Sequence, residues 1–118
     1  MARALPQRTT VDHAPREETS IVVTRDEQTD VLRALSSETA QRILATLGDE
    51  PGTASDVAEA VDVSLQNVDY HLGSLREAGL VEPVETWYSA KGREMTVYAL
   101  TTERLVFQFG DAPGRSSS

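Results

Sequence analysis

The chain has 118 residues, which is enough for one domain with one modest hydrophobic core. It has no cysteine, and this excludes disulfides, thiolate metal sites and a cysteine-based redox switch. No apolar run approaches the roughly 20 residues needed to span a bilayer, and the N-terminus lacks the apolar core of a signal peptide. We therefore expect a soluble protein of the cytoplasm with no membrane contact.

The net charge of −8 has the wrong sign for a conventional nucleic-acid-binding protein, whose affinity comes largely from neutralised phosphates. Only one of the 11 basic residues is a lysine, and aromatic residues are scarce. Such a composition is similar to that of proteins adapted to molar intracellular salt, as in halophilic archaea. At that ionic strength the Debye length is about 3 Å, so only close contacts with DNA would matter. The alternative is an acidic domain that never touches DNA.

The N-terminal part of the chain has a single short apolar run. Residues 1–19 mix arginine, threonine, proline and acidic residues without an apolar period, which predicts a flexible tail. Ile21-Val22-Val23 is too short to be a stable element alone. It can add a strand to a sheet edge or to a partner subunit, or it can pack on the core as an extended lead-in.

Capping residues and apolar periodicity predict two helices in the next thirty residues. Asp30 can cap the first helix, and either Ser36 or Ser37 can cap a second that runs to about Leu47. The apolar residues expected to make the contacts of these helices are Val31, Leu32, Ala34, Leu35, Ala40, Ile43, Leu44 and Leu47.

A third helix is predicted after the turn signal of residues 48–52. Thr53 and Asp56 have the spacing of a capping box at its start. Only Asp62 and Val63 separate this helix from the next capping residue, so the two helices must cross steeply, as in a helix-turn-helix. Asp62 stands where a turn glycine is usual, and aspartate tolerates the left-handed backbone needed there.

Residues 64–80 predict an amphipathic helix with an unusual polar face. Ser64 is a good N-cap, and Val68, Leu72 and Leu75 recur at helical spacing on one side. Gly79 supplies the positive φ that ends a helix. The other side carries a row of flat hydrogen-bonding side chains: Gln66, Asn67, Tyr70 and Ser74.

Two strands are predicted after this helix, over residues 80–88 and 94–100. The loop between them contains a glycine, so they form a β-hairpin, and Pro83 confines the first strand to a sheet edge or a strand start. A helix-turn-helix followed at once by a hairpin is a winged helix.

Residues 105–109 contain both phenylalanines of the chain and form the last ordered segment expected. This cluster predicts either a subunit interface or a cap on the core of its own domain. Residues 111–118 are expected to be a disordered C-terminal tail.

A family resemblance is carried by four segments, which follow one another in the expected order. They are LSSETAQRIL (35–44), VSLQNVDYHL (63–72), LREAGLV (75–81) and a wing from Tyr88 to Tyr98. Together, residues 30–100 resemble the ArsR-like branch of winged-helix transcription regulators, and more closely the short acidic regulators of haloarchaea. The resemblance implies an α/β, mainly α, winged helix-turn-helix of three to four helices and a two-stranded wing. An additional short N-terminal strand is an option, and residues 20–110 would hold the domain with its terminal dimerisation segments.

Metal-sensing members of this family use cysteines on the helix before the recognition helix, or His and Asp near the terminal helices. Here residues 55–61 hold no cysteine, and His13 and His71 are the only histidines. We therefore expect no metal and no cofactor, and a His/carboxylate site shared across a dimer is the alternative left open.

The resemblance implies that the N-terminal half of residues 64–77 meets base edges in the major groove. Gln66 and Asn67 can each pair bidentately with adenine, and Lys91 and Arg93 on the wing loop can meet phosphate or the minor groove. Gly73 costs roughly 1 kcal/mol relative to alanine in a helix, which close approach of the backbone to DNA would explain. The full set expected to contact DNA is Ser64, Gln66, Asn67, Asp69, Tyr70, Ser74, Lys91, Arg93, Arg42 and Arg76. For the last two arginines, surface ion pairs are equally natural.

The function expected from these features is sequence-specific regulation of transcription by a homodimer on a pseudo-palindromic duplex, with potassium ions at the DNA interface. The alternative is a winged-helix module that docks on the transcription machinery. No nucleophile–base set or phosphate-binding loop points to an enzyme. The residues expected in the dimer interface are Leu105, Val106, Phe107, Phe109, Ile21 and Val23.

Overall fold

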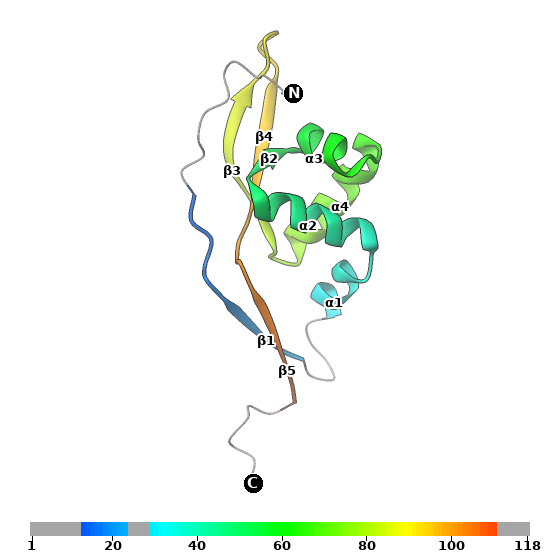
Figure 1. Cartoon of the computed structure of the whole chain (residues 1–118), viewed down its shortest axis with the longest axis vertical. Coiled ribbons are helices and arrows are strands. Elements are labelled where there is room, and N and C mark those ends of the chain that lie inside the picture. Colours follow the sequence, from blue (N-terminus) through cyan, green and yellow to red (C-terminus); the bar gives the residue numbers. More distant parts are fainter. Residues whose placement is uncertain (1–12, 24–28, 111–118) are drawn as a thin grey trace.

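The computed structural model describes residues 13–23 and 29–110, with four helices and five strands among them (Figure 1). The helices are α1 (Thr29–Leu35), α2 (Glu38–Asp49), α3 (Ala54–Val61) and α4 (Leu65–Glu77). The strands are β1 (Thr19–Val23), β2 (Gly52–Thr53), β3 (Val81–Tyr88), β4 (Glu94–Leu100) and β5 (Leu105–Phe109). The fold is the winged helix-turn-helix expected from the sequence, with its optional N-terminal strand present.

The helices lie together on one side of a three-stranded antiparallel sheet in the order β2-β4-β3 (Figure 1). β3 is an edge strand, as Pro83 predicted, and the register shifts between Pro83 and Glu85. β2 was not expected, because residues 48–52 predicted a turn alone. Its two residues, Gly52 and Thr53, are buried and pair with Tyr98 and Val97 of β4.

The hydrophobic core joins the four helices to the sheet. Each fully buried valine, leucine or isoleucine side chain stabilises the fold by about 1.5–3 kcal/mol. Leu32, expected to provide apolar contacts of the first helix, is 42% exposed. The core residues with no exposed surface are Ile43, Val57, Val68, Leu75 and Val97.

The ends of the first two helices follow local capping rules, with one exception. Ser37, rather than Ser36, caps α2 by accepting a hydrogen bond from the N–H of Ala40 (3.2 Å). Asp30, predicted as the cap of the first helix, lies inside its first turn instead, because the helix already includes Thr29. There its carboxylate still complements the positive end of the helix dipole.

β1 and β5 form a separate two-stranded parallel sheet, called here the β1–β5 ribbon (residues 19–23 and 105–109). Ile21 is paired with Phe107 and Val23 with Phe109. The ribbon extends beyond the helices, at the end of the molecule opposite the β3–β4 hairpin (Figure 1). The sequence pattern contained no signal for this pairing of the two ends of the chain.

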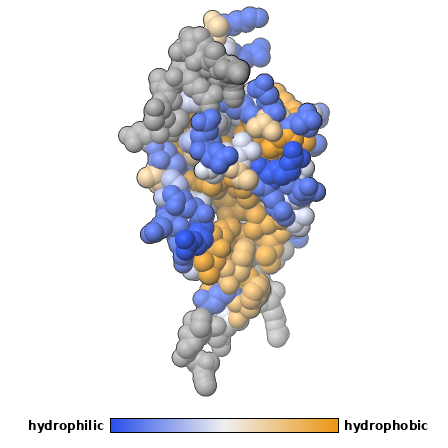
Figure 2. Space-filling model, viewed as in Figure 1, coloured by the Kyte–Doolittle hydropathy of each residue, from blue (hydrophilic) through white to orange (hydrophobic). Residues whose placement is uncertain are grey.

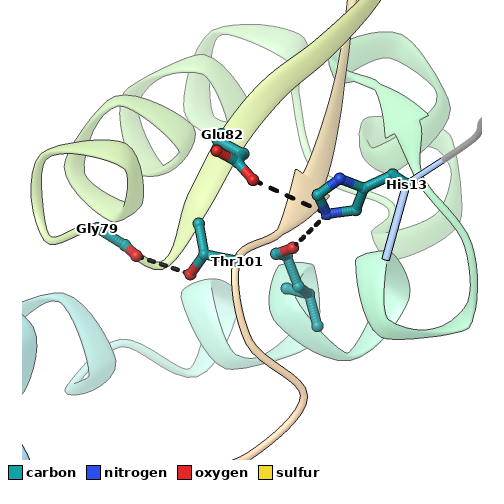
Figure 3. Close-up of polar contacts among 5 residues, drawn as sticks. His13, Gly79, Glu82 and Thr101 are labelled. Atoms are coloured by element: carbon teal, nitrogen blue, oxygen red, sulfur yellow. Dashed lines mark hydrogen bonds and ion pairs between the residues drawn. The ribbon is translucent and has the colours of Figure 1, made fainter. Parts of the chain in front are cut away.

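Residues 13–18, which fall in the segment predicted as a tail, run beside the sheet. His13 Nε2 donates to the carbonyl of Leu100 (2.9 Å) and lies 3.8 Å from a carboxylate oxygen of Glu82, as Figure 3 shows. Arg16 forms a bridge with Thr102. The rest of that predicted tail, residues 1–12, and the predicted C-terminal tail, residues 111–118, lie outside the described residues. Within the described ranges, no helix is long and apolar enough to cross a membrane.

Candidate nucleic-acid interface

α3 and α4 form a helix-turn-helix whose turn is held by backbone and side-chain bonds. The capping box at Thr53 and Asp56 is present with both of its hydrogen bonds, each 3.1 Å long. Asp62 adopts the left-handed conformation predicted for it, with φ 59°. The turn is therefore short and fixed, and it sets the direction in which α4 leaves.

α4 begins and ends with the predicted residues. Ser64 caps it by accepting from the N–H of Asn67 (3.1 Å). At the other end, Gly79 has φ 81°, and the N–H of Leu80 bonds to the carbonyl of Leu75 (2.9 Å), which is a Schellman motif. Val68, Leu72 and Leu75 anchor the helix in the core. This anchoring leaves the position and rotation of α4 little freedom.

The polar row on the outer side of α4 is exposed along its first two turns. Gln66, Asn67 and Asp69 are exposed, and Tyr70 is 71% exposed. Ser74, one turn later, is half-buried. The ring of Tyr70 packs edge-on against that of His71, with the centroids 5.2 Å apart, so the tyrosine is oriented although it is exposed.

The tip of the β3–β4 hairpin is organised by Ser89. Its hydroxyl oxygen accepts from the backbone N–H groups of Lys91 (3.2 Å) and Arg93 (3.1 Å). Its own N–H donates to the carbonyl of Arg93 (2.9 Å), and Gly92 takes φ 79° to close the turn. The two cationic side chains are thus presented from a defined loop and are both exposed.

A cleft of about 540 Å³ separates this hairpin from the helix-turn-helix. It brings together Asp69 of α4 with Lys91 and Arg93 of the wing, three of the residues predicted to contact DNA. Glu94 adds a second carboxylate to the same walls, and Ser55 comes from the start of α3. The polar row of α4 does not line the cleft, and three of its members, Gln66, Asn67 and Tyr70, are exposed to solvent beside it.

The two other arginines predicted at this surface are placed differently. Arg42 projects from α2, and its guanidinium donates to the carbonyl of Val61 at the end of α3 (2.7 Å). It therefore holds the helix-turn-helix together, and only its remaining N–H groups are available to a phosphate. Arg76 is exposed in the last turn of α4, away from the cleft.

Sequence reasoning missed two features of this surface. Leu65, the first residue of α4, is 48% exposed and lines the cleft, which gives the polar surface an apolar contact point. Ser89 lies in the loop between the two predicted strands. Ser side chains often bond to the backbone a few residues on, so its place two and four residues before the bonded N–H groups is the signal that the sequence contains.

The residues predicted for a dimer interface meet in the β1–β5 ribbon. Ile21, Leu105 and Phe107 pack against the core of their own domain, which is one of the two alternatives considered. Val106 is 37% exposed and Phe109 is 77% exposed, so the same strand also presents apolar surface to solvent. In residues 13–23 and 29–110, no three His, Asp or Glu side chains come together as a metal site would require.

Comparison with known proteins agrees with this geometry. The family model for a helix-turn-helix domain matches residues 35–84. An ArsR-like transcriptional regulator from Rhodococcus sp. RHA1 is similar at 38% sequence identity and a TM-score of 0.52, over 62% of this chain and 63% of that one. A possible transcriptional regulatory protein from Mycobacterium bovis (fragment 1–100) shares the fold at 22% identity and a TM-score of 0.50, over 61% of this chain and 71% of that one.

The same Mycobacterium bovis fragment in solution is described as a homodimeric winged helix-turn-helix DNA-binding domain, at 22% identity and a TM-score of 0.49 over 61% of both chains. No curated protein matches the chain. The chain spans a little less than two thirds of the length of the Rhodococcus regulator, at 63%.

Proposed function

We propose that this winged helix-turn-helix protein is a regulator of the ArsR type, which binds a specific double-stranded DNA site as a homodimer; its similarity to the helix-turn-helix family model and to the Rhodococcus regulator supports this. A role as a transcription regulator is consistent with the expectation of a non-enzymatic protein, and both are part of the proposal. The proposed site of action is the cytoplasm.

The observation that carries the proposal is that an exposed polar surface of α4 lies beside the cleft that the cationic wing lines. Lys91 and Arg93 of the wing line the cleft, and α4, which is anchored in the core, exposes Gln66, Asn67 and Tyr70 beside it. A helix in the major groove and a hairpin beside it would contact base edges and phosphates respectively. The amides are the candidates for adenine, and the exposed Leu65 is a candidate for a thymine methyl group.

The charge of −8 shapes how such binding would work. Asp69 and Glu94 line the same cleft as the two wing cations, so the net charge of these four side chains is zero. Long-range attraction to DNA is then weak, and affinity would rest on direct contacts. In molar KCl, potassium ions between these carboxylates and the phosphates would reduce the remaining repulsion, and this high-salt setting is part of the proposal.

A homodimer would place two α4 helices on a pseudo-palindromic site. Two-fold symmetry of the protein would be mirrored in half-sites about one helical turn of DNA apart. The proposal therefore predicts the spacing of the two half-sites even where their base sequence is unknown.

The experiment is selection of binding sites from random duplexes with the full chain, repeated from 0.05 to 3 M KCl. We expect one enriched pseudo-palindromic motif that persists at high salt. Because few phosphates are neutralised, affinity should fall by much less than the 10³–10⁵-fold that six to ten phosphate contacts produce between 50 and 200 mM salt. No enriched motif at any KCl concentration would overturn the proposal and favour a module that docks on another protein.

A further inference from the structure

The β1–β5 ribbon is an unusual structure to find exposed. Parallel strands occur almost only in sheets whose faces are covered, and a two-stranded sheet alone is at best marginally stable in water. In this chain no third described strand joins the ribbon. Figure 2 shows apolar residues gathered over the part of the molecule where the ribbon emerges. These facts together indicate that another element covers the ribbon.

The hydrogen bonds of the ribbon show which groups are free. The N–H of Thr19 donates to the carbonyl of Arg104 (2.9 Å), and the N–H of Gly110 donates to that of Val23 (3.1 Å). In a parallel ladder, every second residue of a strand directs its backbone N–H and C=O groups at the neighbouring strand. The backbone groups of the even-numbered residues of β5 therefore bond to β1. The backbone groups of Leu105, Phe107 and Phe109 therefore point outward, along the free edge of β5.

The distribution of charge favours a second copy of the chain as the partner of this edge. Each copy of the chain carries −8, so two copies repel one another across most of their surfaces. Neither β1 nor β5 contains a charged residue. Beside the start of the ribbon, Glu18 and Arg104 neutralise one another at 3.4 Å. The ribbon is thus a surface where two like-charged copies can approach.

An apolar pocket at the base of β5 supplies a second contact. It has a volume of about 350 Å³, and its walls include Leu44, Ala45, Leu100 and Leu105. Phe109 lies at the far end of the same strand, on the same face as Leu105, and is 77% exposed. One strand therefore carries an apolar pocket at one end and an exposed aromatic ring at the other.

We propose that β5 pairs antiparallel with β5 of a second copy, about a two-fold axis at Phe107. This proposal rests on the homodimer of the proposed function and specifies its interface. Centring the axis on the middle residue pairs all five residues of each strand and gives a four-stranded sheet in which β5 is no longer an edge. Phe107 then exchanges both backbone hydrogen bonds with the partner's Phe107. Phe109 lies opposite the partner's Leu105, beside the partner's apolar pocket.

Disulfide trapping tests the register directly, because the chain has no native cysteine. Val106 and Gln108 point away from the core, and the proposed axis places Val106 opposite the partner's Gln108. Their Cα atoms would be about 4.5 Å apart, within disulfide range, whereas the two copies of Val106 would be about 7–8 Å apart. We expect a 1:1 mixture of Val106→Cys and Gln108→Cys chains to form a covalent dimer on oxidation, and either variant alone to form far less.

The matched control uses the outer edge of β1. Ser20→Cys and Val22→Cys have the same spacing on an exposed strand and should not cross-link when mixed. Cross-linking of this pair in place of the β5 pair would overturn the proposal, because β1 would then be the dimer edge. A light-scattering mass of a monomer, or a dimer in which neither pair cross-links, would overturn it as well.

A charge at the interface gives an independent measurement. Phe109→Glu should raise the dimer dissociation constant by about 100-fold or more, since it replaces an aromatic ring that the proposed interface would bury. Val22→Glu adds the same charge to the other strand and should change the constant much less. Both positions are exposed in the protomer, so neither variant should unfold it. An unchanged dissociation constant for Phe109→Glu would contradict the proposed contact.

The outcomes separate this interface from DNA binding. A cross-linked dimer that selects no DNA motif would leave the interface standing and remove the proposed function. Selection of a palindromic motif without cross-linking of the β5 pair would do the reverse.

Discussion

In the helix-turn-helix, apolar side chains are inside and polar side chains are displayed, whereas the β1–β5 ribbon displays apolar side chains. Val68 and Leu75 are buried by elements of the same chain, and the polar face of α4 is left for a ligand. In the ribbon, Phe109 and Val106 remain exposed although half of the strand packs on the core. The first region is complete as a folded unit, whereas the second would be completed only in the proposed dimer.

The largest difference between the two regions is expected in the free energy of unfolding. Leu75→Ala removes a fully buried side chain of α4 and should lower the free energy of unfolding by about 2–5 kcal/mol. Phe107→Ala should also destabilise, but by an amount that grows with protein concentration, because in the proposed dimer part of its burial would come from the partner. Thermal unfolding at two protein concentrations a hundredfold apart distinguishes the two. Equal concentration dependence in both variants would show that the ribbon is not an interface.

The next effect concerns which contacts read sequence. Gln66→Ala or Asn67→Ala should lose about 1–3 kcal/mol of discrimination at one base pair, since the amide no longer pairs with its base. Lys91→Ala or Arg93→Ala should weaken all duplexes alike, because phosphates carry no sequence information. Competition binding with single-base variants of the selected site measures both. Identical behaviour of the two groups would break the division between helix and wing.

Gly73 offers a smaller effect with opposite signs in stability and binding. A Cβ at this position would meet nothing within 4 Å in the chain, so Gly73→Ala should stabilise the free protein by up to about 1 kcal/mol. If DNA approaches the backbone there, the same methyl group should weaken DNA binding. Chemical denaturation and a gel shift with the same preparation provide the two measurements. A gain in stability with unchanged DNA affinity would remove close approach as the reason for the glycine.

The smallest effect is expected at the wing loop. Ser89→Ala removes an acceptor for two backbone N–H groups, and each such bond contributes about 0.5–1.5 kcal/mol. We expect a two- to tenfold loss of DNA affinity that is the same for all sequences, because the loop holds its cations less firmly. Thr96→Ala, on the next strand of the same cleft, is the control and should change affinity little.

The sequence predicted most of those parts of the fold that depend on neighbouring residues. The caps at Thr53 and Ser64, the left-handed Asp62 and the glycine end of α4 each need only the few residues around them, although the same local rules left Ser36 and Ser37 both open and wrongly made Asp30 a cap. The apolar stripes of α2, α3 and α4 were also predicted, and the order of the elements followed from them.

Contacts between distant segments were not predicted. The strand β2, the bond from Arg42 to Val61 and the parallel pairing of β1 with β5 each join residues that no local pattern connects. At the candidate interface, the helical spacing of the polar residues predicted the polar row of α4. The cleft between α4 and the wing depends on how the β3–β4 hairpin packs beside the helices, and residue spacing does not determine this packing.

The segment between β4 and β5 would set the spacing of the two α4 helices in the proposed dimer. Thr101 lies between these strands, and its hydroxyl donates to the carbonyl of Gly79 (2.7 Å), as Figure 3 shows. Its N–H donates to the carbonyl of Leu80 (3.1 Å). These two hydrogen bonds fix the start of the segment that leads to β5 against the residues that follow α4. In a dimer joined through β5, this connection would determine how many base pairs separate the half-sites. Lengthening the segment by one residue should therefore change the preferred spacing of the half-sites without changing the half-site sequence.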